Sequence, residues 1–268
     1  MAQFNNAMEV FKLLLKNNCK DCGKPTCLAF AGAVFQGQAN VIECPHIDSD
    51  VVSKYGTEKS NQISELEKEY IEQISFYKSE VEKTDLESKA ELLGGRFEKE
   101  KLIIKVMGKS ISMDKRGGLS SDIHINPWLS IPFYEYVLNS KGLDLTSNWV
   151  PLRELHLGND WNNFFRHRCE KTLKRVADSY TNFFEDIIEL FQGKRVENHY
   201  DSDISLRLLP LPKVPILICY NEPEDGLGSD LNLFFDDTTS ENLGVEFLYR
   251  LVTGISVMFE KLSRTHGG

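Results

Sequence analysis

The chain carries the stretch CKDCGKPTC at residues 19–27 and a further cysteine at position 44, directly before Pro45. Its first four cysteines are therefore Cys19, Cys22, Cys27 and Cys44, separated by two, four and sixteen residues. The N-terminus is polar and shows no basic stretch followed by an apolar signal core, so we expect a cytoplasmic protein. Because thiols stay reduced in the cytoplasm, such a set is typical of metal ligation rather than of disulfides.

The spacing of these four cysteines favours a 4Fe-4S cluster. Such a cluster needs four thiolates that converge from a compact loop, and three close cysteines plus a distant fourth, often followed by proline, is a common arrangement. Gly23 allows the sharp turn that this loop requires. Structural zinc is an alternative, although its sites usually show two short cysteine pairs, and a redox-active dithiol of Cys19 and Cys22 is another. We predict all four cysteines as cluster ligands.

The flanking pattern places this loop between two short helices. Apolar residues recur at three- and four-residue intervals over residues 8–15, and residues 26–35 are rich in alanine, so both segments are expected to be helical. Cys27 then lies in a first helical turn, where free N–H groups and the positive end of the helix dipole favour a thiolate. The two remaining cysteines, Cys169 and Cys219, are expected to be buried apolar residues.

Length and composition narrow the class of protein. The 268 residues suggest two domains, with one long domain as the competing count. Hydrophobic residues make up 41% and charged residues 26% of the chain, which is typical of a folded globular protein. The net charge of -9 repels a phosphate backbone, so nucleic acid is not an expected partner. No apolar run approaches the roughly 20 residues that cross a bilayer, so no membrane span is expected.

Changes along the chain predict three parts. These are a cluster domain at residues 1–57, an amphipathic helical linker at residues 58–91 and an α+β domain at residues 92–268. Apolar residues recur at helical spacing over residues 58–83 among many Glu and Lys residues. We expect this helix to dock on the second domain, and a two-chain coiled coil is the alternative.

The second domain begins with strands. Strand-type residues at 101–107 and 110–113 predict a hairpin around Gly108-Lys109. Further segments have helical or strand patterns, namely helices at 128–138, 161–176, 183–191 and 242–262 and strands at 214–220 and 231–235. Because helices and strands occur in blocks rather than in regular alternation, we predict an α+β fold and not a doubly wound parallel sheet.

The N-terminal motif resembles a known family. Residues 19–31, CKDCGKPTCLAFA, together with Cys44-Pro45, closely resemble the small 4Fe-4S domain of the corrinoid iron-sulfur protein, over about residues 5–60. The resemblance implies that the four cysteines hold a cluster that passes single electrons at low potential. In the corrinoid protein, such electrons return an oxidised cobalt centre to its nucleophilic cob(I) state.

Residues 92–262 resemble a domain family of anaerobic bacteria and archaea that often follows such a cluster domain. The matching residues are Leu145-Thr146, Trp149-Val150-Pro151, Arg153-Glu154-Leu155, Pro210, Pro212, Val214-Pro215, Glu222 and Phe235-Asp236. This resemblance implies no particular activity. The segment does not resemble the corrinoid-binding parts of the corrinoid iron-sulfur protein, so the destination of the electron does not follow from it.

Three residues of the second domain are candidates for binding a corrinoid. Asp122-Ile-His124 matches the first half of the pattern with which cobalamin proteins ligate cobalt through histidine, although Pro127 replaces the expected glycine; a structural or surface histidine is the alternative. Trp149 and Arg153 are expected where a loop enters a helix. An aromatic face and a fixed cation there suit a flat macrocycle, whereas core packing and a salt bridge are the plainer explanation.

Together these patterns predict an iron-sulfur protein of anaerobic one-carbon or related metabolism. It would carry one 4Fe-4S cluster and transfer single low-potential electrons to a corrinoid, such as cobalamin, or itself bind one. Its expected partners are a redox protein or a corrinoid protein, and an electron carrier is favoured over a stand-alone enzyme. The first alternative is a cluster-bearing binding or sensor module that docks to a partner enzyme. The second is an enzyme with corrinoid-dependent chemistry of its own.

Overall fold

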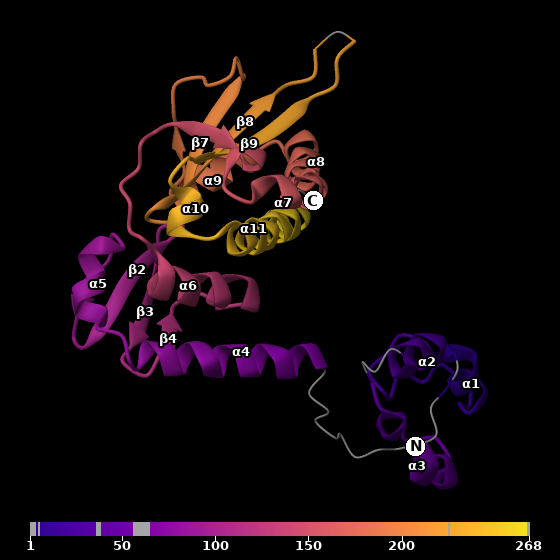
Figure 1. The fold of residues 1–268 in the computed structure, drawn as a ribbon. Coiled ribbons are helices and arrows are strands. Elements are labelled where there is room, and N and C mark those ends of the chain that lie inside the picture. Colours follow the sequence, from indigo (N-terminus) through magenta and orange to yellow (C-terminus); the bar gives the residue numbers. More distant parts are fainter. Residues whose placement is uncertain (1–3, 5, 36–38, 56–64, 225, 267–268) are drawn as a thin grey trace. The chain divides into compact units, whose positions relative to one another are not determined.

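The computed structural model describes residues 4, 6–35, 39–55, 65–224 and 226–266 (Figure 1). The chain divides into two compact units, Met1–Lys68 and Glu69–Gly268. The described part of the first unit is helical, whereas the second unit combines helices with two antiparallel sheets. This arrangement confirms the predicted α+β class, with a small helical N-terminal part and a larger mixed C-terminal part.

Short helical segments build the first unit. They are α1 (Ala7–Lys12), α2 (Cys27–Phe35), the 3-10 helix η1 (Val41–Glu43) and α3 (Ser49–Tyr55). The predicted helix at residues 8–15 is present but ends at Lys12, whereas α2 matches the alanine-rich segment. The buried centre of the first unit is formed by Val10, Phe30, Ala31 and Val41. So small an apolar core contributes little stability, and a bound metal would add to it.

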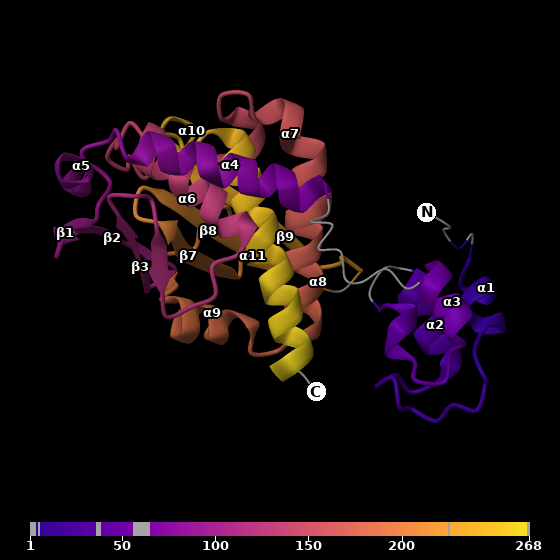
Figure 2. The same ribbon diagram turned by 90° about the horizontal axis from the view of Figure 1, so that it is seen from below.

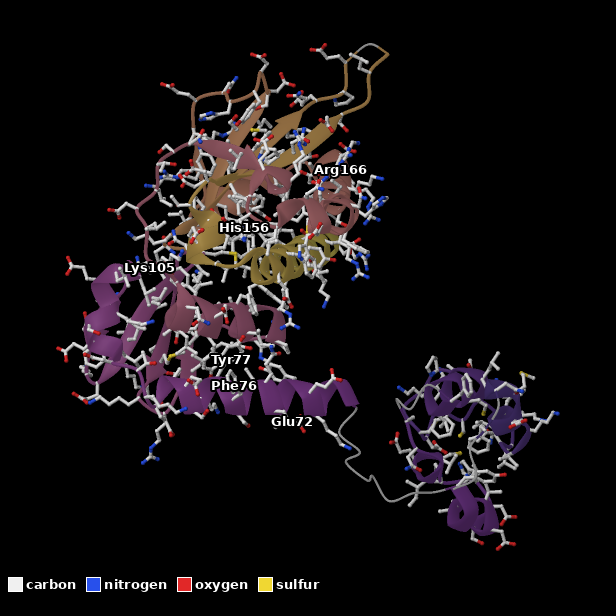
Figure 3. All side chains as sticks on the ribbon, viewed as in Figure 1. Glu72, Phe76, Tyr77, Lys105, His156 and Arg166 are labelled. Atoms are coloured by element: carbon white, nitrogen blue, oxygen red, sulfur yellow. The ribbon has the colours of Figure 1, made fainter. Side chains whose placement is uncertain are left out.

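Helix α4 (Glu65–Val81) packs along helix α6 (Pro127–Asn139) of the second unit (Figure 2). Tyr77, labelled in Figure 3, is buried. Its ring stacks on that of Tyr134 with centroids 5.5 Å apart, and its hydroxyl donates a hydrogen bond of 3.1 Å to Glu135 Oε2. The amphipathic pattern correctly predicts this docking from residue 69 onward. Residues 58–64 of the predicted linker lie outside the described residues.

A four-stranded antiparallel sheet follows, with its strands in sequence order. The strands are β1 (Arg96–Glu98), β2 (Lys101–Val106), β3 (Lys109–Asp114) and β4 (Leu119–Ser121). The predicted hairpin is confirmed, because Val106 pairs with Lys109 and leaves a two-residue turn. In that turn Met107 and Gly108 have φ values of 45° and 79°, as a type I′ turn requires.

The second sheet has five antiparallel strands in the order β5-β9-β8-β7-β6. The strands are β5 (Trp149–Pro151), β6 (Lys194–Arg195), β7 (Ile204–Leu211), β8 (Val214–Asn221) and β9 (Asp230–Asp236). Strands β8 and β9 confirm the prediction. Strand β7 does not appear among the sequence expectations, since Pro210 interrupts its pattern; it is a strand because it pairs with β8 along a bulged register.

Helices pack on both sheets of the second unit. They are α5 (Leu86–Leu92), α6, the 3-10 helix η2 (Leu152–Glu154), α7 (Gly158–Phe165), the π-helix η3 (Arg166–Glu170), α8 (Lys171–Ser179), α9 (Phe183–Phe191), α10 (Thr239–Asn242) and α11 (Val245–His266). Helix α5 lies against β1 and β2 of the four-stranded sheet. Helix α11 packs on α6, α7 and α8 (Figure 2). The helix predicted at 161–176 is interrupted by the π-helix, and the one predicted at 242–262 is divided between α10 and α11. In the part of the chain that the structure describes, no helix is both long and apolar enough to span a membrane.

Candidate metal centre

The loop that carries Cys19 and Cys22 is wound by residues in the left-handed backbone region. Lys16, Lys20 and Gly23 have φ values of 61°, 70° and 72°. Such residues turn the chain sharply, and glycine does so without steric cost. The Gly23 N–H donates a hydrogen bond of 2.8 Å to the Lys20 carbonyl oxygen, which closes the turn between the two cysteines. The loop is therefore short and tightly folded.

Helix α2 begins at Cys27, which places this residue in the first helical turn as predicted, but two of the N–H groups there are not free. The Cys27 N–H donates to Asn18 Oδ1 at 2.8 Å, and the Ala29 N–H donates to Thr26 Oγ1 at 3.1 Å. The expected free N–H groups of this turn are therefore not free at Cys27 and Ala29, because side chains from the preceding loop cap them. Instead, Asn18 fixes the loop to the start of the helix.

Cys44 is held by a separate capping arrangement. It follows η1, and its N–H donates a hydrogen bond of 3.2 Å to the Val41 carbonyl oxygen. At the other end of η1, Asn40 Oδ1 accepts from the Ile42 N–H and Glu43 Oε1 accepts from the Asn40 N–H, each at 3.2 Å. This reciprocal capping box sets the position of Cys44.

All four predicted ligands line one pocket, together with apolar side chains that include Leu14 and Phe30. Cys27 and Cys44 are buried, whereas Cys19 and Cys22 are half-buried, and all four are free thiols. Four converging thiols are the donor set of an iron-sulfur cluster, so the residues fit that group. The space they enclose is about 10 Å³.

Two further polar residues lie beside the thiols. His46 Nε2 and Asp21 Oδ2 are 2.6 Å apart, and the potential ligand atoms of Cys19, Asp21 and His46 lie within 4.8 Å of one another. The hydrogen bond from His46, followed by that from Cys19, lowers the pKa of Asp21. Sequence reasoning missed this pair, although Asp21 directly precedes Cys22 and His46 follows the Cys44-Pro45 pair. A sulfur, oxygen and nitrogen donor set suits zinc, so the zinc alternative stays open.

In the second unit, two of the three corrinoid candidates meet. Trp149 and Arg153 line one cleft of about 480 Å³, but His124 is exposed between β4 and α6 and is not among the residues that line it. The expectation that Trp149 lies on a loop is wrong, because it belongs to β5 and pairs with Asp236 of β9. Arg153 lies in η2, directly after that strand.

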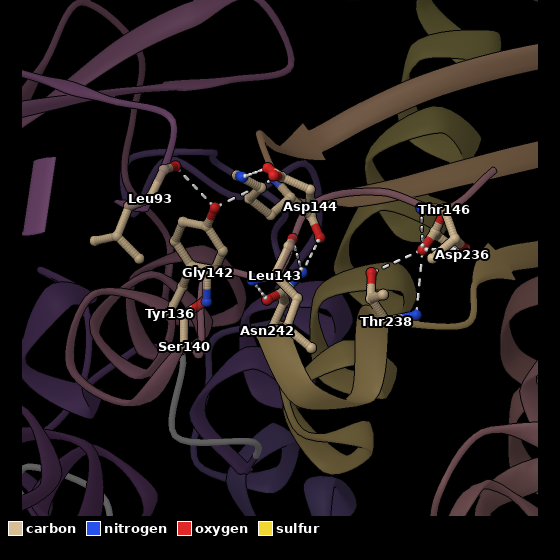
Figure 4. A network of polar contacts seen from close by, with 11 residues as sticks. Leu93, Tyr136, Ser140, Gly142, Leu143, Asp144, Thr146, Asp236, Thr238 and Asn242 are labelled. Carbon is tan, nitrogen blue, oxygen red and sulfur yellow. Dashed lines mark hydrogen bonds and ion pairs between the residues drawn. The ribbon is translucent and has the colours of Figure 1, made fainter. Parts of the chain in front are cut away.

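A buried carboxylate holds the segment that leads to Trp149 (Figure 4). Asp236 is fully buried; its Oδ1 accepts from the Thr146 N–H at 3.3 Å and from the Thr238 hydroxyl at 2.7 Å, and its Oδ2 accepts from the Ser147 N–H at 2.7 Å. Nearby, the Asn242 side chain accepts from the Leu143 N–H and donates to the Leu143 carbonyl oxygen. Buried polar groups that are satisfied in this way define one chain path.

Cys169 and Cys219 are buried in the second unit, as predicted. Burial, the largest effect, raises the pKa of Cys169 to about 12 despite hydrogen bonds with Thr253 and Ser256. Burial also raises the pKa of Cys219. A thiol that stays protonated and covered is a poor ligand and a poor nucleophile.

Comparisons with known proteins separate the two units. Residues 85–258 match the family model described as "Domain of unknown function (DUF3786)", and residues 16–46 match the model described as "Putative Fe-S cluster". The acetyl-CoA decarbonylase/synthase complex subunit gamma of Methanocaldococcus jannaschii is 41% identical over 49 residues, 18% of this chain and 10% of that protein. The corrinoid/iron-sulfur protein large subunit of Moorella thermoacetica is 48% identical over 40 residues, 15% of this chain and 9% of that protein.

These curated relatives match over a short segment only. The chain spans about a tenth of their length, and the matching segments lie in their N-terminal regions. No solved structure shows significant similarity to the chain.

Proposed function

The chain belongs to the DUF3786 family, whose model covers residues 85–258, and we propose that it is an electron-transfer protein with one 4Fe-4S cluster in front of that family domain. The observation that carries this proposal is the meeting of Cys19, Cys22, Cys27 and Cys44 at one pocket, within the segment that matches the iron-sulfur family model. In functional terms, residues 1–57 would hold the cluster, residues 58–91 would connect and residues 92–268 would bind the acceptor or a partner.

The residues around the pocket have distinct tasks in this proposal. A bound 4Fe-4S cluster supplies a one-electron couple at low potential. The four thiolates hold it, while Leu14 and Phe30 exclude water on the inner side. Cys19 and Cys22 are half-buried, so their edge of the site is the one open to a redox partner. Asn18 keeps this loop against α2 and limits rearrangement when the charge of the site changes.

The proposed acceptor is a corrinoid. One curated relative supports it by its printed name, because it is a corrinoid/iron-sulfur protein. The corrinoid could belong to a partner protein or bind to this chain beside Trp149 and Arg153. His124 would then not take part, because it does not line the same cleft. The reduced state of the thiols that this function needs is expected in the cytoplasm of an anaerobe.

The first test is cofactor analysis of full-length protein purified without oxygen. We expect about four irons and four sulfides per chain, a broad visible absorption and a spectrum that bleaches on reduction. Cys27→Ser should lose most of the iron, whereas Cys169→Ser, a buried thiol far along the chain, should keep it. Zinc in place of iron, or equal iron in both variants, would overturn the proposal.

A second measurement tests the electron-transfer role. The chain, reduced at low potential, should pass electrons to cob(II)alamin in solution or in a corrinoid protein, with a rate that depends on the cluster. A cluster that strong low-potential reductants leave oxidised would instead favour the binding or sensor module. Corrinoid retained in stoichiometric amount after gel filtration would support a site on this chain, and its absence would favour a partner protein as the acceptor.

A further inference from the structure

The cleft in the second unit is a formed site of ligand size. Its lining comes from β5, η2, α7, the π-helix η3, β9 and the segment before β7. Its volume of about 480 Å³ lies within the range of roughly 300 to 1,000 Å³ that is usual for small-molecule pockets. Three kinds of side chain meet there, which are arginines, a buried carboxyl group and aromatic rings.

Two guanidinium groups border the cleft with their donors available. The side chains of Arg153 and Arg166 are 58% and 64% exposed. Their nearest carboxylate oxygens, on Glu154 and Glu170, lie at 3.7 Å and 3.9 Å, which is beyond hydrogen-bond distance. Within the described residues, neither guanidinium donates a hydrogen bond to the protein. Both can therefore bind a phosphate or carboxylate with a pair of N–H groups.

The π-helix places Arg166, which Figure 3 labels, and Glu170 at this cleft. A π-helical insertion adds a residue and so rotates the helix face that follows by about 100°; such insertions are rare and often occur at functional sites. Here Cys169 points into the core and is fully buried, while its neighbour Glu170 lines the cleft. Arg168 of the same segment lines a different groove, beside Trp161.

Glu170 is a largely buried carboxyl group with unused hydrogen-bonding capacity. Its side chain is 14% exposed, and Oε1 accepts a hydrogen bond of 3.2 Å from the Leu233 N–H of β9. Among the described residues, no hydrogen-bond donor lies within bonding distance of its Oε2, and Arg166 Nε is 3.9 Å away. Burial, the largest effect, raises the pKa of Glu170. Such a group can accept a hydrogen bond from a ligand or, when protonated, donate one.

Tyr200 provides an aromatic platform at the same cleft. One face of its ring stacks on Phe234, with centroids 4.0 Å apart and planes at 10°, and its hydroxyl donates to the Trp149 carbonyl oxygen at 2.5 Å. The residue is 54% exposed, so its outer face is open to a ring. Its φ of 55° is unusual for a bulky side chain, and such backbone conformations gather at ligand sites.

We propose that this cleft binds a nucleotide, that is, a heteroaromatic ring that carries a phosphate. Tyr200 would stack on the ring, Arg153 and Arg166 would bind the phosphate, and Glu170 would hydrogen-bond a ring N–H or a ribose hydroxyl. This inference goes beyond the iron-sulfur cluster, because no residue of the first unit takes part, and it rests on the proposed corrinoid function only where the nucleotide is part of a corrinoid. A free nucleotide and the nucleotide arm of a corrinoid share this chemistry.

The test is calorimetric titration of the full-length, cluster-containing protein with AMP, adenosine, inorganic phosphate, cobalamin and cobinamide, which lacks the nucleotide arm. AMP should bind at least about 10-fold more tightly than adenosine or phosphate. Arg166→Gln should weaken AMP binding by about 10-fold, whereas Arg168→Gln, the matched control on the same π-helix, should change it less than about twofold. Tyr200→Ala should weaken AMP binding but not phosphate binding.

The same titrations show whether the bound nucleotide is free or is the arm of a corrinoid. Cobalamin bound more tightly than both AMP and cobinamide would identify the corrinoid arm, and AMP bound more tightly than cobalamin would identify a free nucleotide. No binding of either at millimolar concentration, or equal effects of Arg166→Gln and Arg168→Gln, would overturn the inference. Iron content should stay at the wild-type level in every variant. If the protein contains iron but binds neither AMP nor cobalamin, only the inference about the cleft is wrong. If it binds one of them but contains no iron, only the proposed cluster is wrong.

Discussion

The carboxamide oxygen of Asn18 accepts a hydrogen bond of 2.8 Å from the backbone N–H of Cys27, nine residues later. One side chain thus connects the loop that carries Cys19 and Cys22 with the helix that presents Cys27. This hydrogen bond helps to bring the thiols of Cys19, Cys22 and Cys27 to one pocket, although it involves no sulfur atom. This relationship makes Asn18 a positioning residue for the proposed cluster.

Replacing Asn18 with alanine should therefore loosen the site. We expect a loss of about 1 kcal/mol in the stability of the helix start, the usual value of an N-terminal cap. Iron release to a chelator should then be several-fold faster, as followed by the decay of visible absorption. Asn18→Asp keeps the acceptor oxygen and should restore the slower release. Equal release rates for the alanine and aspartate variants would contradict the assigned role.

The lysines of the pocket should tune the proposed cluster. Lys20 lines the pocket, whereas Lys12 on α1 does not. A positive charge near the site favours the reduced state, so Lys20→Glu should lower the reduction potential by on the order of tens of millivolts at low ionic strength, and salt should diminish the shift. A redox titration followed by electron paramagnetic resonance would measure it. Lys12→Glu is the control, and a shift of the same size there would argue against a local effect.

The buried phenols of the second unit should make its stability fall at high pH. Burial, the largest effect, raises the pKa of both Tyr77 and Tyr134 to about 12, and the Glu135 carboxylate adds to the shift at Tyr77. In the unfolded chain, phenols ionise near pH 10. The folded state holds these protons more tightly, so the free energy of unfolding is unaffected below about pH 10 and decreases as the pH rises from about 10 to about 12.

Urea unfolding at several pH values would test this dependence. All three tryptophans, Trp128, Trp149 and Trp161, belong to the second unit, so their fluorescence reports on it. Tyr134→Phe removes one ionising group and should make the decrease shallower. Tyr55→Phe, in the first unit, should leave the slope as it is. A wild-type stability that stayed constant up to pH 12 would show that these phenols are not protected.

Asp236 should be the most sensitive polar residue of the second unit. Asp236→Ala leaves the N–H groups of Thr146 and Ser147 without their acceptor inside the protein. We expect the free energy of unfolding to fall by about 3 kcal/mol, because each buried polar group left unpaired costs about 1 to 3 kcal/mol. The same urea experiment measures this loss.

The neighbouring carboxylate provides the control for that variant. Asp237 is exposed and accepts from Thr146 Oγ1 at 2.6 Å and from the Asn148 side chain at 2.9 Å. Asp237→Ala should cost less than about 1 kcal/mol, since water can replace these bonds. Equal losses for the two variants would show that burial is not what makes Asp236 important.

Interactions between near neighbours in the chain could be predicted from the sequence. The hairpin around Gly108, the helix that begins at Cys27 and the helix α9 each depend on periodicity or turn chemistry within about ten residues. The four cysteines could also be recognised from the sequence, because the ligands of such a site lie within 26 residues of the chain and their spacing is characteristic. These elements are found close to where the pattern places them.

Other features depend on residues far apart in the chain and leave no local pattern. Trp149 is in a strand because Asp236, 87 residues later, pairs with it, and strand β7 exists through its pairing with β8 across a bulge. A search for apolar residues at a period of 3.6 does not reveal the π-helix at Arg166–Glu170. This π-helix nevertheless places Arg166 and Glu170 at the cleft that Tyr200 also lines. Backbone pairing and packing across the second unit set these positions, because their stabilising contacts form only when the distant segments meet.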